Sequence, residues 1–552
     1  MLFQRSSILA LCYAAIAFFV SLSNAVDVEI ASRHRKLRLI PCLTKALSAE
    51  GDAAKRIITS KDELYTDART GEKINTKQLP LAVAYAMTQT EVPLMFSCAK
   101  INRVKVVVRA GGHHFEAYSA LTGTLVIDIG HINQVSVSAD RQTAVVGAGT
   151  RLGGLYVALS EYGTSWIGGI CPTVGIAGYI SAGGFNMQMR SKGMAVEYVK
   201  SIKVLLASGE VVTASSKRHP DLFWAMLGGG GNTYAIALEF TLRLVALPNS
   251  AMLYLKWQGY GDDTAYQVAK RFLDWAPKAD PALTASIFIY KNELEVTGWY
   301  LGKTEAELQT LIDSSGFLNI RSQYRNATSI TGDCNTDASR VFGVQGGIFV
   351  CQPTSPFITF ALNSSPDPFT PIPGFKQFQY NETTSAPKTL TAPAWNRLRR
   401  KSKSFFVTKD KLLNDAGIKG VIDHIQAGDA EGGITAEWHA WNISTPATQD
   451  MAFAWRQKAY AHMEFTVRGS EDAATDAARE KYMAGFESFL RPKLGGASYT
   501  GYADDSISTN PYTSYFGDNV CRLVRVKRVY DPLNVFTNPL AIPPTVPRGV
   551  RC

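Results

Sequence analysis

The sequence predicts an α+β protein with two dissimilar parts. Between Leu43 and about Val245, short β-branched runs alternate with glycine-rich turns and two helical patterns. After Pro248 and Asn249 the pattern changes to strands and amphipathic helices that are typical of an antiparallel sheet with helices. No Gly-x-Gly-x-x-Gly follows the first strand, so a doubly wound dinucleotide-binding domain is disfavoured.

The first part should contain five strands and two helices. Apolar or β-branched runs predict the strands, and helical periodicity predicts the helices. The strands are expected at Val104 to Val108, Leu125 to Ile129, Thr143 to Val146, Ile202 to Leu206 and Ala235 to Leu242, and the helices at Arg151 to Glu161 and Asp221 to Leu227.

The second part should form an antiparallel sheet with helices, which we call the cap. Its strands are expected at Met252 to Trp257, Thr284 to Tyr290 and Leu294 to Tyr300, and its helices at Asp263 to Trp275, Glu305 to Ser315 and Glu471 to Leu490. Residues 320–400 are rich in Ser, Thr, Pro and Asn, which predicts a long insertion over one face of the cap.

The first 25 residues have the pattern of a secretory signal peptide. Arg5 precedes the apolar run Ile8 to Val20, and Ser23-Asn24-Ala25 provides small residues for cleavage. The run is too short to cross a bilayer, and no later run is long enough. We therefore expect a secreted, extracellular protein without a membrane segment.

The chain carries a formal net charge of +10, and loss of Arg5 with the signal would leave about +9. Basic residues cluster at Arg33 to Arg38 and Arg397 to Lys403, which is more typical of solvated surface than of a nucleic-acid site. The tetrapeptide Arg35 to Arg38 also resembles a host-entry motif of secreted effectors, but four residues in a basic segment are weak evidence.

Two glycine-rich stretches suggest a cofactor cavity. Gly168 to Gly184 holds one cysteine, Cys171, in a run dense in glycine, and Arg109-Ala-Gly-Gly-His-His-Phe115 directly follows the first predicted strand. Glycine lets a backbone turn sharply and approach a ligand closely. Either stretch alone is equally typical of a tight turn.

Together the two stretches resemble the berberine bridge enzyme-like flavoprotein oxidases, which include glucooligosaccharide oxidases. The resemblance implies an FAD-binding domain of the vanillyl-alcohol-oxidase (PCMH) type followed by an antiparallel-sheet substrate domain. It implies bicovalent FAD, with His113 on the 8α-methyl and Cys171 on C6 of the ring. Further implied cofactor contacts are Arg109, Gly111, Gly112, Thr173, Val174, Gly175, Gly178, Gly183, Gly184 and Asn538.

Three positions depart from the family pattern, and one position favours an oxidase. Leu227 stands where relatives often carry arginine, Asn186 lies in the small-residue run after Gly184, and Phe115 replaces a frequent tyrosine. These changes could alter flavin contacts, and the last weakens a ring-closing activity on alkaloids. Val174 in Cys-Pro-Thr-Val-Gly resembles oxidases, whereas leucine at this point accompanies dehydrogenases.

The resemblance also implies three candidates for the acid–base group. Tyr502, in Ser498-Tyr-Thr-Gly-Tyr502, is the first choice for general base, although its phenolate would need stabilisation at ordinary pH. Asp429, three residues before paired glycines in a segment expected to be a cap strand from Val421, would position the substrate hydroxyl or act as base. Glu464 corresponds to the glutamate base of berberine bridge enzyme if the register holds.

The substrate is expected to be an alcohol, with two classes open. Trp438 and Trp441 could stack on sugar rings, and Tyr499 belongs to the paired-tyrosine segment, so the first expectation is an oxidase of oligosaccharide reducing ends that forms a lactone and hydrogen peroxide. An aromatic alcohol or other secondary metabolite is the second, with Glu464 as base. A secreted binding or effector protein on an inherited fold is the third hypothesis.

Cysteine count and glycosylation sequons fit secretion. Removal of Cys12 with the signal and use of Cys171 by flavin leave six cysteines, enough for three disulfides. Proximity favours Cys334 with Cys351 and Cys521 with Cys552, while the resemblance implies Cys42 with Cys98. Sequons begin at Asn326, Asn363, Asn381 and Asn442.

The expected organisation is therefore a signal peptide at 1–25, the FAD-binding domain at 26–248, the cap at 249–497 with the insertion 320–400, and a C-terminal segment at 498–552 that returns to the first domain. We expect a monomer that uses a small-molecule or oligosaccharide substrate and molecular oxygen, with no metal, nucleic-acid or membrane partner.

Overall fold

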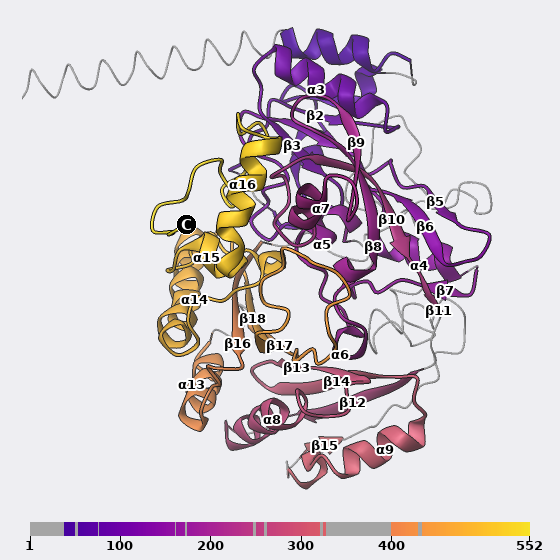
Figure 1. Cartoon of the computed structure of the whole chain (residues 1–552). Coiled ribbons are helices and arrows are strands. Elements are labelled where there is room, and N and C mark those ends of the chain that lie inside the picture. Colours follow the sequence, from indigo (N-terminus) through magenta and orange to yellow (C-terminus); the bar gives the residue numbers. More distant parts are fainter. Residues whose placement is uncertain are drawn as a thin grey trace, which may run out of the picture.

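The computed structural model describes residues 38–552 except 50–52, 75–76, 161, 172–173, 247–249, 259–261, 321–323, 327–398 and 429–432. Two sheet systems lie one above the other in Figure 1, the first part of the chain at the top and the cap below. The predicted signal peptide, the boundary near residue 248 and most of the insertion lie outside the described residues, so these predictions remain untested.

The first part contains a small, largely parallel sheet with strand order β1-β2-β4-β3. Strands β2, β4 and β3 run parallel, and helix α3 (Glu91–Ile101) connects β2 to β3. The strands are β1 (Ile57–Ile58), β2 (Ala82–Tyr85), β3 (Val106–Arg109) and β4 (Leu125–Asp128). Both β3 and β4 were predicted, whereas β2 and α3 were not.

A five-stranded antiparallel sheet completes the core of the first part, with order β5-β6-β10-β8-β9. Its strands are β5 (Val135–Val137), β6 (Thr143–Gly147), β8 (Val199–Leu205), β9 (Val211–Ser215) and β10 (Ile236–Arg243), and β7 (Thr164–Ser165) pairs separately with β11 (Val245–Ala246). The helices are α2 (Tyr65–Arg69), α4 (Leu152–Ser160), α5 (Ile176–Ser181), α6 (Met189–Lys192) and α7 (Pro220–Met226). Both helices predicted for this part, now α4 and α7, are confirmed.

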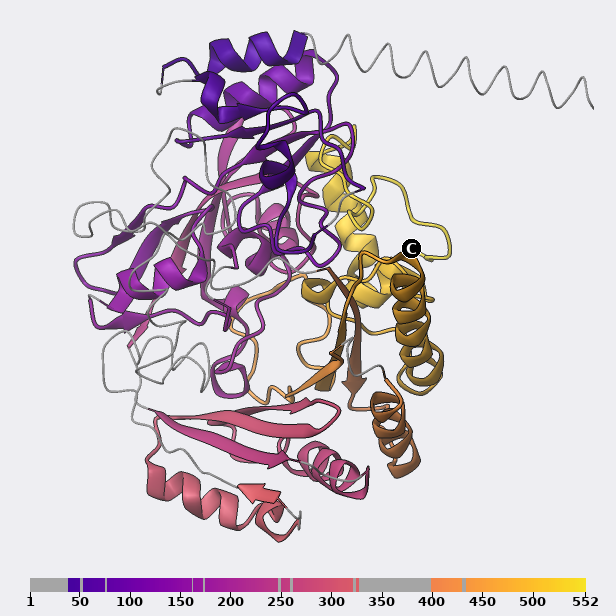
Figure 2. The ribbon, with the colours of Figure 1, turned by 180° about the vertical axis from the view of Figure 1, so that it is seen from behind.

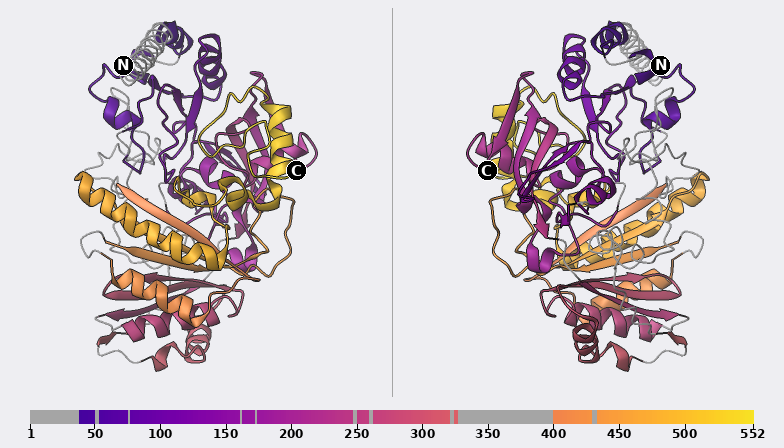
Figure 3. Two further views of the ribbon diagram at one scale, coloured as in Figure 1. Left: turned by 90° about the vertical axis from the view of Figure 1, so that its left-hand side faces the viewer. Right: turned by 90° about the vertical axis from the view of Figure 1, so that its right-hand side faces the viewer.

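The cap is built on a seven-stranded antiparallel sheet with order β15-β12-β14-β13-β17-β18-β16. Helices α13 and α14 lie along one face of this sheet (Figure 3). The strands are β12 (Ser250–Gln258), β13 (Leu283–Ile289), β14 (Glu293–Leu301), β15 (Tyr324–Asn326), β16 (Arg400–Thr408), β17 (Thr435–Ala440) and β18 (Ala459–Arg468), and the helices are α8 (Asp262–Trp275), α9 (Glu305–Asp313), α13 (Asp415–Gln426) and α14 (Ala473–Leu494). All predicted strands and helices of the cap that fall on described residues are present, with one exception.

The exception is the segment from Val421, which was expected to be a strand and is the second half of helix α13. Ile418, Val421, Ile422 and Ile425 are buried at helical spacing, and the side chain of Asn414 caps the helix by accepting a hydrogen bond from the Gly417 N–H. The apolar period is therefore that of a helix, and the strand prediction was wrong.

Side chains alternate along β17 and β18, so apolar residues lie on one face of the cap sheet and polar residues on the other. Ala461, Met463 and Phe465 belong to the apolar core beneath the cap helices. The alternate residues His462, Glu464 and Thr466 therefore face the first part of the chain. In the register of the two strands, Glu437 lies directly opposite Glu464.

The C-terminal segment packs against the first part. Helices α15 (Pro511–Phe516) and α16 (Val520–Tyr530) follow the cap and are drawn in yellow beside the first part in Figure 2. Helix α16 packs beside α7. Lys527 on α16 is fully buried, and its Nζ donates to Asp531 Oδ2 at 2.6 Å and to the carbonyl oxygens of Thr233 and Phe536. The bond to Thr233 attaches the last segment to the first part, and the other two hold the segment's own turn.

Two disulfides occur within the described residues, Cys42–Cys98 and Cys521–Cys552, and both were predicted. Cys334 and Cys351 lie outside the described residues. Of the sequons, Asn442 has a half-buried side chain whose Nδ2 donates to the Pro277 carbonyl oxygen at 2.6 Å. Among the helices of the described ranges, none combines the length and apolar character that a membrane crossing requires.

Candidate active site

A cavity of about 420 Å³ lies between the glycine-rich turns of the first part and the cap sheet. The first part contributes His113 and Cys171 to its wall, and the cap contributes Glu437 and Glu464. Aromatic side chains that line the same cavity are Phe115, Tyr118, Tyr179, Phe185, Tyr234, Phe240, Tyr499, Tyr502 and Phe516. The two motifs that the sequence singled out therefore meet in one place.

The two glycine-rich turns touch each other, which accounts for their composition. A Cβ added to Gly175 would lie 2.3 Å from the Gly111 nitrogen, and a Cβ added to Gly71 would lie 2.3 Å from the Gly112 oxygen. Gly112 also has a φ of 71°, which favours glycine. A side chain at Gly175 would push the His113 turn away from the Cys171 turn.

The residues present fit the implied flavin. His113 and Cys171 line one cavity from neighbouring turns, and Gly178 leaves an open wall because a Cβ there would meet nothing within 4 Å. Burial holds the pKa of His113 well below its usual range, so the imidazole is neutral. Burial raises the pKa of the Cys171 thiol to about 12, and Cys171 is the cysteine without a disulfide in the described part of the chain.

Most of the predicted cofactor contacts line this cavity. Those on its wall are His113, Cys171, Gly111, Gly112, Val174, Gly175, Gly178 and Asn538. The amide of Asn538 also donates to the Gly231 carbonyl oxygen at 3.0 Å, which holds the C-terminal segment against the glycine run 228–231. Thr173 lies outside the described residues.

Arg109, Gly183 and Gly184 lie outside the cavity wall, contrary to prediction. The Arg109 guanidinium is buried on the far side of β3, where Nε pairs with Asp128 Oδ2 at 2.5 Å and Nη1 donates to the Ala68 carbonyl. A Cβ at Gly183 would lie 2.7 Å from the Phe453 ring, and one at Gly184 would lie 2.4 Å from the Ala195 Cβ. These glycines allow close packing beneath the cavity.

The two departures Leu227 and Asn186 also lie outside the cavity wall. Leu227 is fully buried in the core of the first part. Asn186 is fully buried too, and its Nδ2 donates to the carbonyl oxygens of Gly184 and Gly193, each at 3.2 Å. Neither replacement changes the cavity lining.

Trp438 and Trp441 are not substrate-stacking residues, because both side chains are fully buried. Trp438 points into the core under the cap helices. Trp441 packs against Phe185 and Phe453, with ring centroids 5.6 and 5.9 Å apart. Tyr499 does line the cavity, but its hydroxyl accepts the Phe185 N–H at 3.2 Å.

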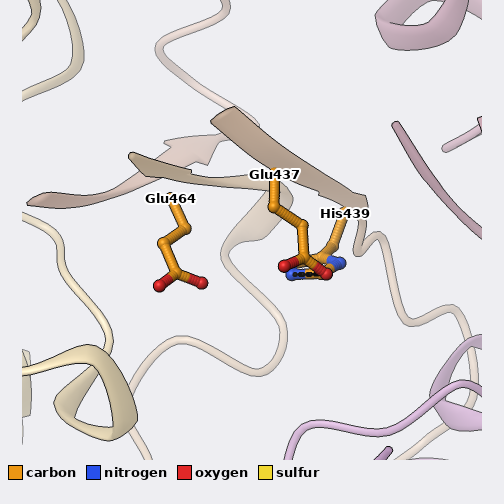
Figure 4. A group of neighbouring side chains, drawn as sticks. All are labelled: Glu437, His439 and Glu464. Atoms are coloured by element: carbon orange, nitrogen blue, oxygen red, sulfur yellow. Dashed lines mark ion pairs between the residues drawn. The ribbon is translucent and has the colours of Figure 1, made fainter. Parts of the chain in front are cut away.

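Glu437 and Glu464 form a carboxyl pair in the cavity wall, and His439 lies beside Glu437 (Figure 4). The three side chains project to the same side of the sheet, and one ligating atom of each lies within 4.8 Å of the other two. Burial raises the pKa of Glu437 to about 7. Burial and then the Glu437 charge raise the pKa of Glu464 well above its usual range.

Tyr502 lines the cavity beside this pair, with its ring 5.1 Å from the Phe115 ring. Burial, then Glu464 and Glu437, raise the pKa of its phenol well above the ordinary value. The stabilisation that a Tyr502 phenolate would need is not found in the described surroundings, which favour the protonated phenol. Asp429, the other predicted partner, lies outside the described residues.

Sequence reasoning missed three cavity residues: Glu72, Arg400 and Glu437. Arg400 at the start of β16 pairs with Glu72 of the first part and lies 4.9 Å above the Phe115 ring, so this pair connects the two parts at the cavity. Glu437 precedes Trp438, so strand alternation alone would have placed it on the face opposite the tryptophan. No local motif marks the other two residues.

Comparison with known proteins agrees with the geometry. A family model described as FAD binding domain matches residues 80–215, and one described as berberine and berberine like matches residues 498–543. The chain is 50% identical to the FAD-linked oxidoreductase pynB of Aspergillus niger over 512 residues, which cover 93% of each chain.

Two solved structures show the same fold. The structure of wild-type BBE-like 1 from Physcomitrella patens has a TM-score of 0.74 at 24% identity, covering 91% of this chain and 99% of that one. The glucooligosaccharide oxidase of Acremonium strictum has a TM-score of 0.73 at 18% identity, covering 92% and 99%. The chain is an FAD-linked oxidoreductase and belongs to the berberine bridge enzyme-like family.

Proposed function

We propose that this chain is an oxidase that removes two electrons and two protons from a substrate alcohol and passes them to oxygen, giving a carbonyl product and hydrogen peroxide. The observation that carries the proposal is the single cavity that His113 and Cys171 share with Glu437 and Glu464. When bound, FAD supplies the hydride acceptor. We infer that His113 and Cys171 hold it covalently, which fits the flavinylation reported for the Acremonium strictum enzyme.

The carboxyl pair is a better general base than Tyr502. A general base works best with a pKa near the operating pH, and burial raises the pKa of Glu437 to about 7. Two carboxyl groups this close resist simultaneous ionisation, so the ionised member accepts the proton of the substrate hydroxyl while the other keeps its own. The protonated phenol of Tyr502 is suited to donate a hydrogen bond to the substrate oxygen.

The cavity favours a compact aromatic alcohol or related secondary metabolite over an oligosaccharide. Its described wall includes several aromatic rings, among them Phe115, Tyr118 and Phe185, whereas both tryptophans proposed for sugar stacking are buried in the cores. The expectation of an oligosaccharide now rests on the resemblance and on Asp429, which keeps its proposed role as positioning partner. The binding-protein hypothesis has no support from the site.

The remaining proposals concern location and oxygen use. Val174 lines the cavity, and its small side chain supports use of oxygen as acceptor. Secretion is supported by the signal-like first 25 residues and by two disulfides. N-terminal sequencing of protein from the culture medium should find Val26 as the first residue.

A substrate panel tests the proposal. Purified flavin-loaded protein is mixed in air with vanillyl alcohol, coniferyl alcohol, cellobiose, chitobiose or galacturonic oligomers, and peroxide and carbonyl product are measured. We expect equal amounts of peroxide and carbonyl from an aromatic alcohol, and none in a matched Glu437→Gln/Glu464→Gln control. Peroxide from a sugar class alone would contradict the preference for aromatic substrates, and reduction of the flavin without peroxide would contradict the oxidase assignment.

A further inference from the structure

We propose that His439, oriented by Ser286, is a positioning residue for Glu437 and directs which carboxylate oxygen of Glu437 faces the substrate. This inference rests on the proposed function, in which Glu437 and Glu464 form the acid–base pair. It assigns different roles to the two carboxyl groups.

His439 and Glu437 are two residues apart on β17, so their side chains share the face toward the cavity. His439 Nε2 lies 3.5 Å from Glu437 Oε1 (Figure 4). Both atoms are buried, and neither has a hydrogen-bond partner among the described residues. A small movement would bring this contact to a normal hydrogen bond, and catalytic hydrogen bonds are often longer before substrate binds.

Ser286 on β13 fixes the orientation of the imidazole. Ser286 lies directly opposite His439 in the strand register, and its Oγ is 2.7 Å from His439 Nδ1. Burial lowers the pKa of His439 to about 3, so the ring is neutral and carries one N–H. The Ser286 hydroxyl has two acceptors within reach, Met187 Sδ at 3.8 Å and the closer His439 Nδ1, and a thioether sulfur is the weaker acceptor. With the hydroxyl donating to Nδ1, the N–H is on Nε2 and points at Glu437 Oε1.

The two carboxyl groups have different polar neighbours. The Arg400 charge acts on Glu464, whereas the polar neighbour within reach of Glu437 Oε1 is His439 Nε2. Other titratable groups that face the pair are His462 from β18, Tyr290 beyond β13, and Glu72, Cys171, Arg400 and Tyr502 across the cavity. With Oε1 held by a neutral donor, the second oxygen of Glu437 remains available to the substrate hydroxyl.

The test measures the titration of Glu437 in flavin-loaded protein without substrate. The carboxylic-acid C=O band is followed by pH-difference infrared spectroscopy, and Glu437→Gln identifies the band. In His439→Leu the carboxylate loses its donor, so the midpoint of the band should move up by about one pH unit. Ser286→Ala should shift it in the same direction by less, and His439→Gln, which places an amide near Nε2, should restore part of the change.

Thr284→Val is the matched control. Thr284 lies two residues before Ser286 on β13, is buried, and its hydroxyl has no hydrogen-bond partner among the described residues. Its removal should leave the midpoint unchanged. The inference is overturned if the midpoint of the Glu437 band does not shift in Ser286→Ala and His439→Gln, and His439→Leu is either unshifted or unfolded. That result would leave the carboxyl pair intact. If no carboxylic-acid band disappears in Glu437→Gln, the proposed carboxyl pair itself is overturned.

Discussion

Glu437 and Glu464 show how much the role of one residue depends on strand register. Glu464 was a candidate from its motif, but Glu437 becomes its partner only because β17 and β18 pair with these two residues opposite each other. The pairing joins segments separated by 18 residues without a short turn, so no local signal in the sequence fixes it. The alternation of side chains along β17 also explains why Trp438, the next residue, is buried under the helices.

At the residue scale, we predict that Glu437→Gln slows flavin reduction by about 10²–10⁴-fold, because it removes the proton acceptor. Glu464→Gln should slow it by less, because it replaces the carboxyl group that keeps its proton. Tyr502→Phe should slow flavin reduction about tenfold, because it removes a hydrogen-bond donor and not the base. In the unmodified protein the rate should rise with pH around 7, where Glu437 ionises.

Stopped-flow reduction by the substrate found in the panel measures these rates. The Tyr502 variant serves as the control, because it removes a hydroxyl from the same wall. A larger loss of the flavin-reduction rate in Tyr502→Phe than in Glu437→Gln would show that the phenol is the base.

At the scale of elements, the two glycine-rich turns were the strongest signal in the sequence, and their contact could be anticipated from composition. Helix α13 could have been predicted from its apolar spacing, but the resemblance suggested a strand. The Glu72–Arg400 pair could not have been predicted, because it joins residues more than 300 positions apart across two sheet systems.

Two of these glycines give a matched pair of variants, one expected to lose stability and the other expected to lose flavin. Gly175→Ala should destabilise the protein and separate the two turns, because its Cβ would lie 2.3 Å from the Gly111 nitrogen. Gly178→Ala meets nothing within 4 Å and should fold normally, but its methyl group projects toward the cavity wall and should weaken flavin incorporation.

Thermal unfolding and the flavin-to-protein absorbance ratio separate the two effects. We expect a lowered Tm for Gly175→Ala and a near-normal Tm with a lowered flavin ratio for Gly178→Ala. Full flavin content in Gly178→Ala would place the cofactor elsewhere in the cavity.

At the scale of the whole molecule, the cap and the first part have separate apolar cores. Their existence was predictable, because each has its own pattern of apolar residues. The resemblance predicted a cavity between them. It could not predict which charged groups line that cavity, because these side chains come from both parts.

Buried titratable groups should give the holoenzyme a stability maximum between about pH 4.5 and 6.5. Burial lowers the pKa of His114 to about 4 and of His439 to about 3, so the unfolded chain binds more protons below 6.5 and stability falls as the pH drops. Burial raises the pKa of Glu116 and Glu437 from 4.5 to about 7, so the native state binds more protons and stability falls as the pH rises through that range.

Tm measured across pH 4 to 8 checks this expectation, with the flavin absorbance confirming that the cofactor stays bound. Glu437→Gln should flatten the alkaline side of the curve, because glutamine does not titrate. A curve that rises steadily from pH 5 to 8 in the unmodified protein would contradict the assigned pKa directions.

We propose that His113 and Cys171 hold FAD covalently in the cavity that contains the carboxyl pair. The most direct measurement is the visible spectrum of acid-precipitated, washed protein for the unmodified chain, His113→Ala, Cys171→Ala and the double variant. We predict yellow pellets from the first three and a colourless pellet from the double variant, since either bond alone retains the flavin. A colourless pellet from the unmodified protein, or a yellow one from the double variant, would contradict the assignment.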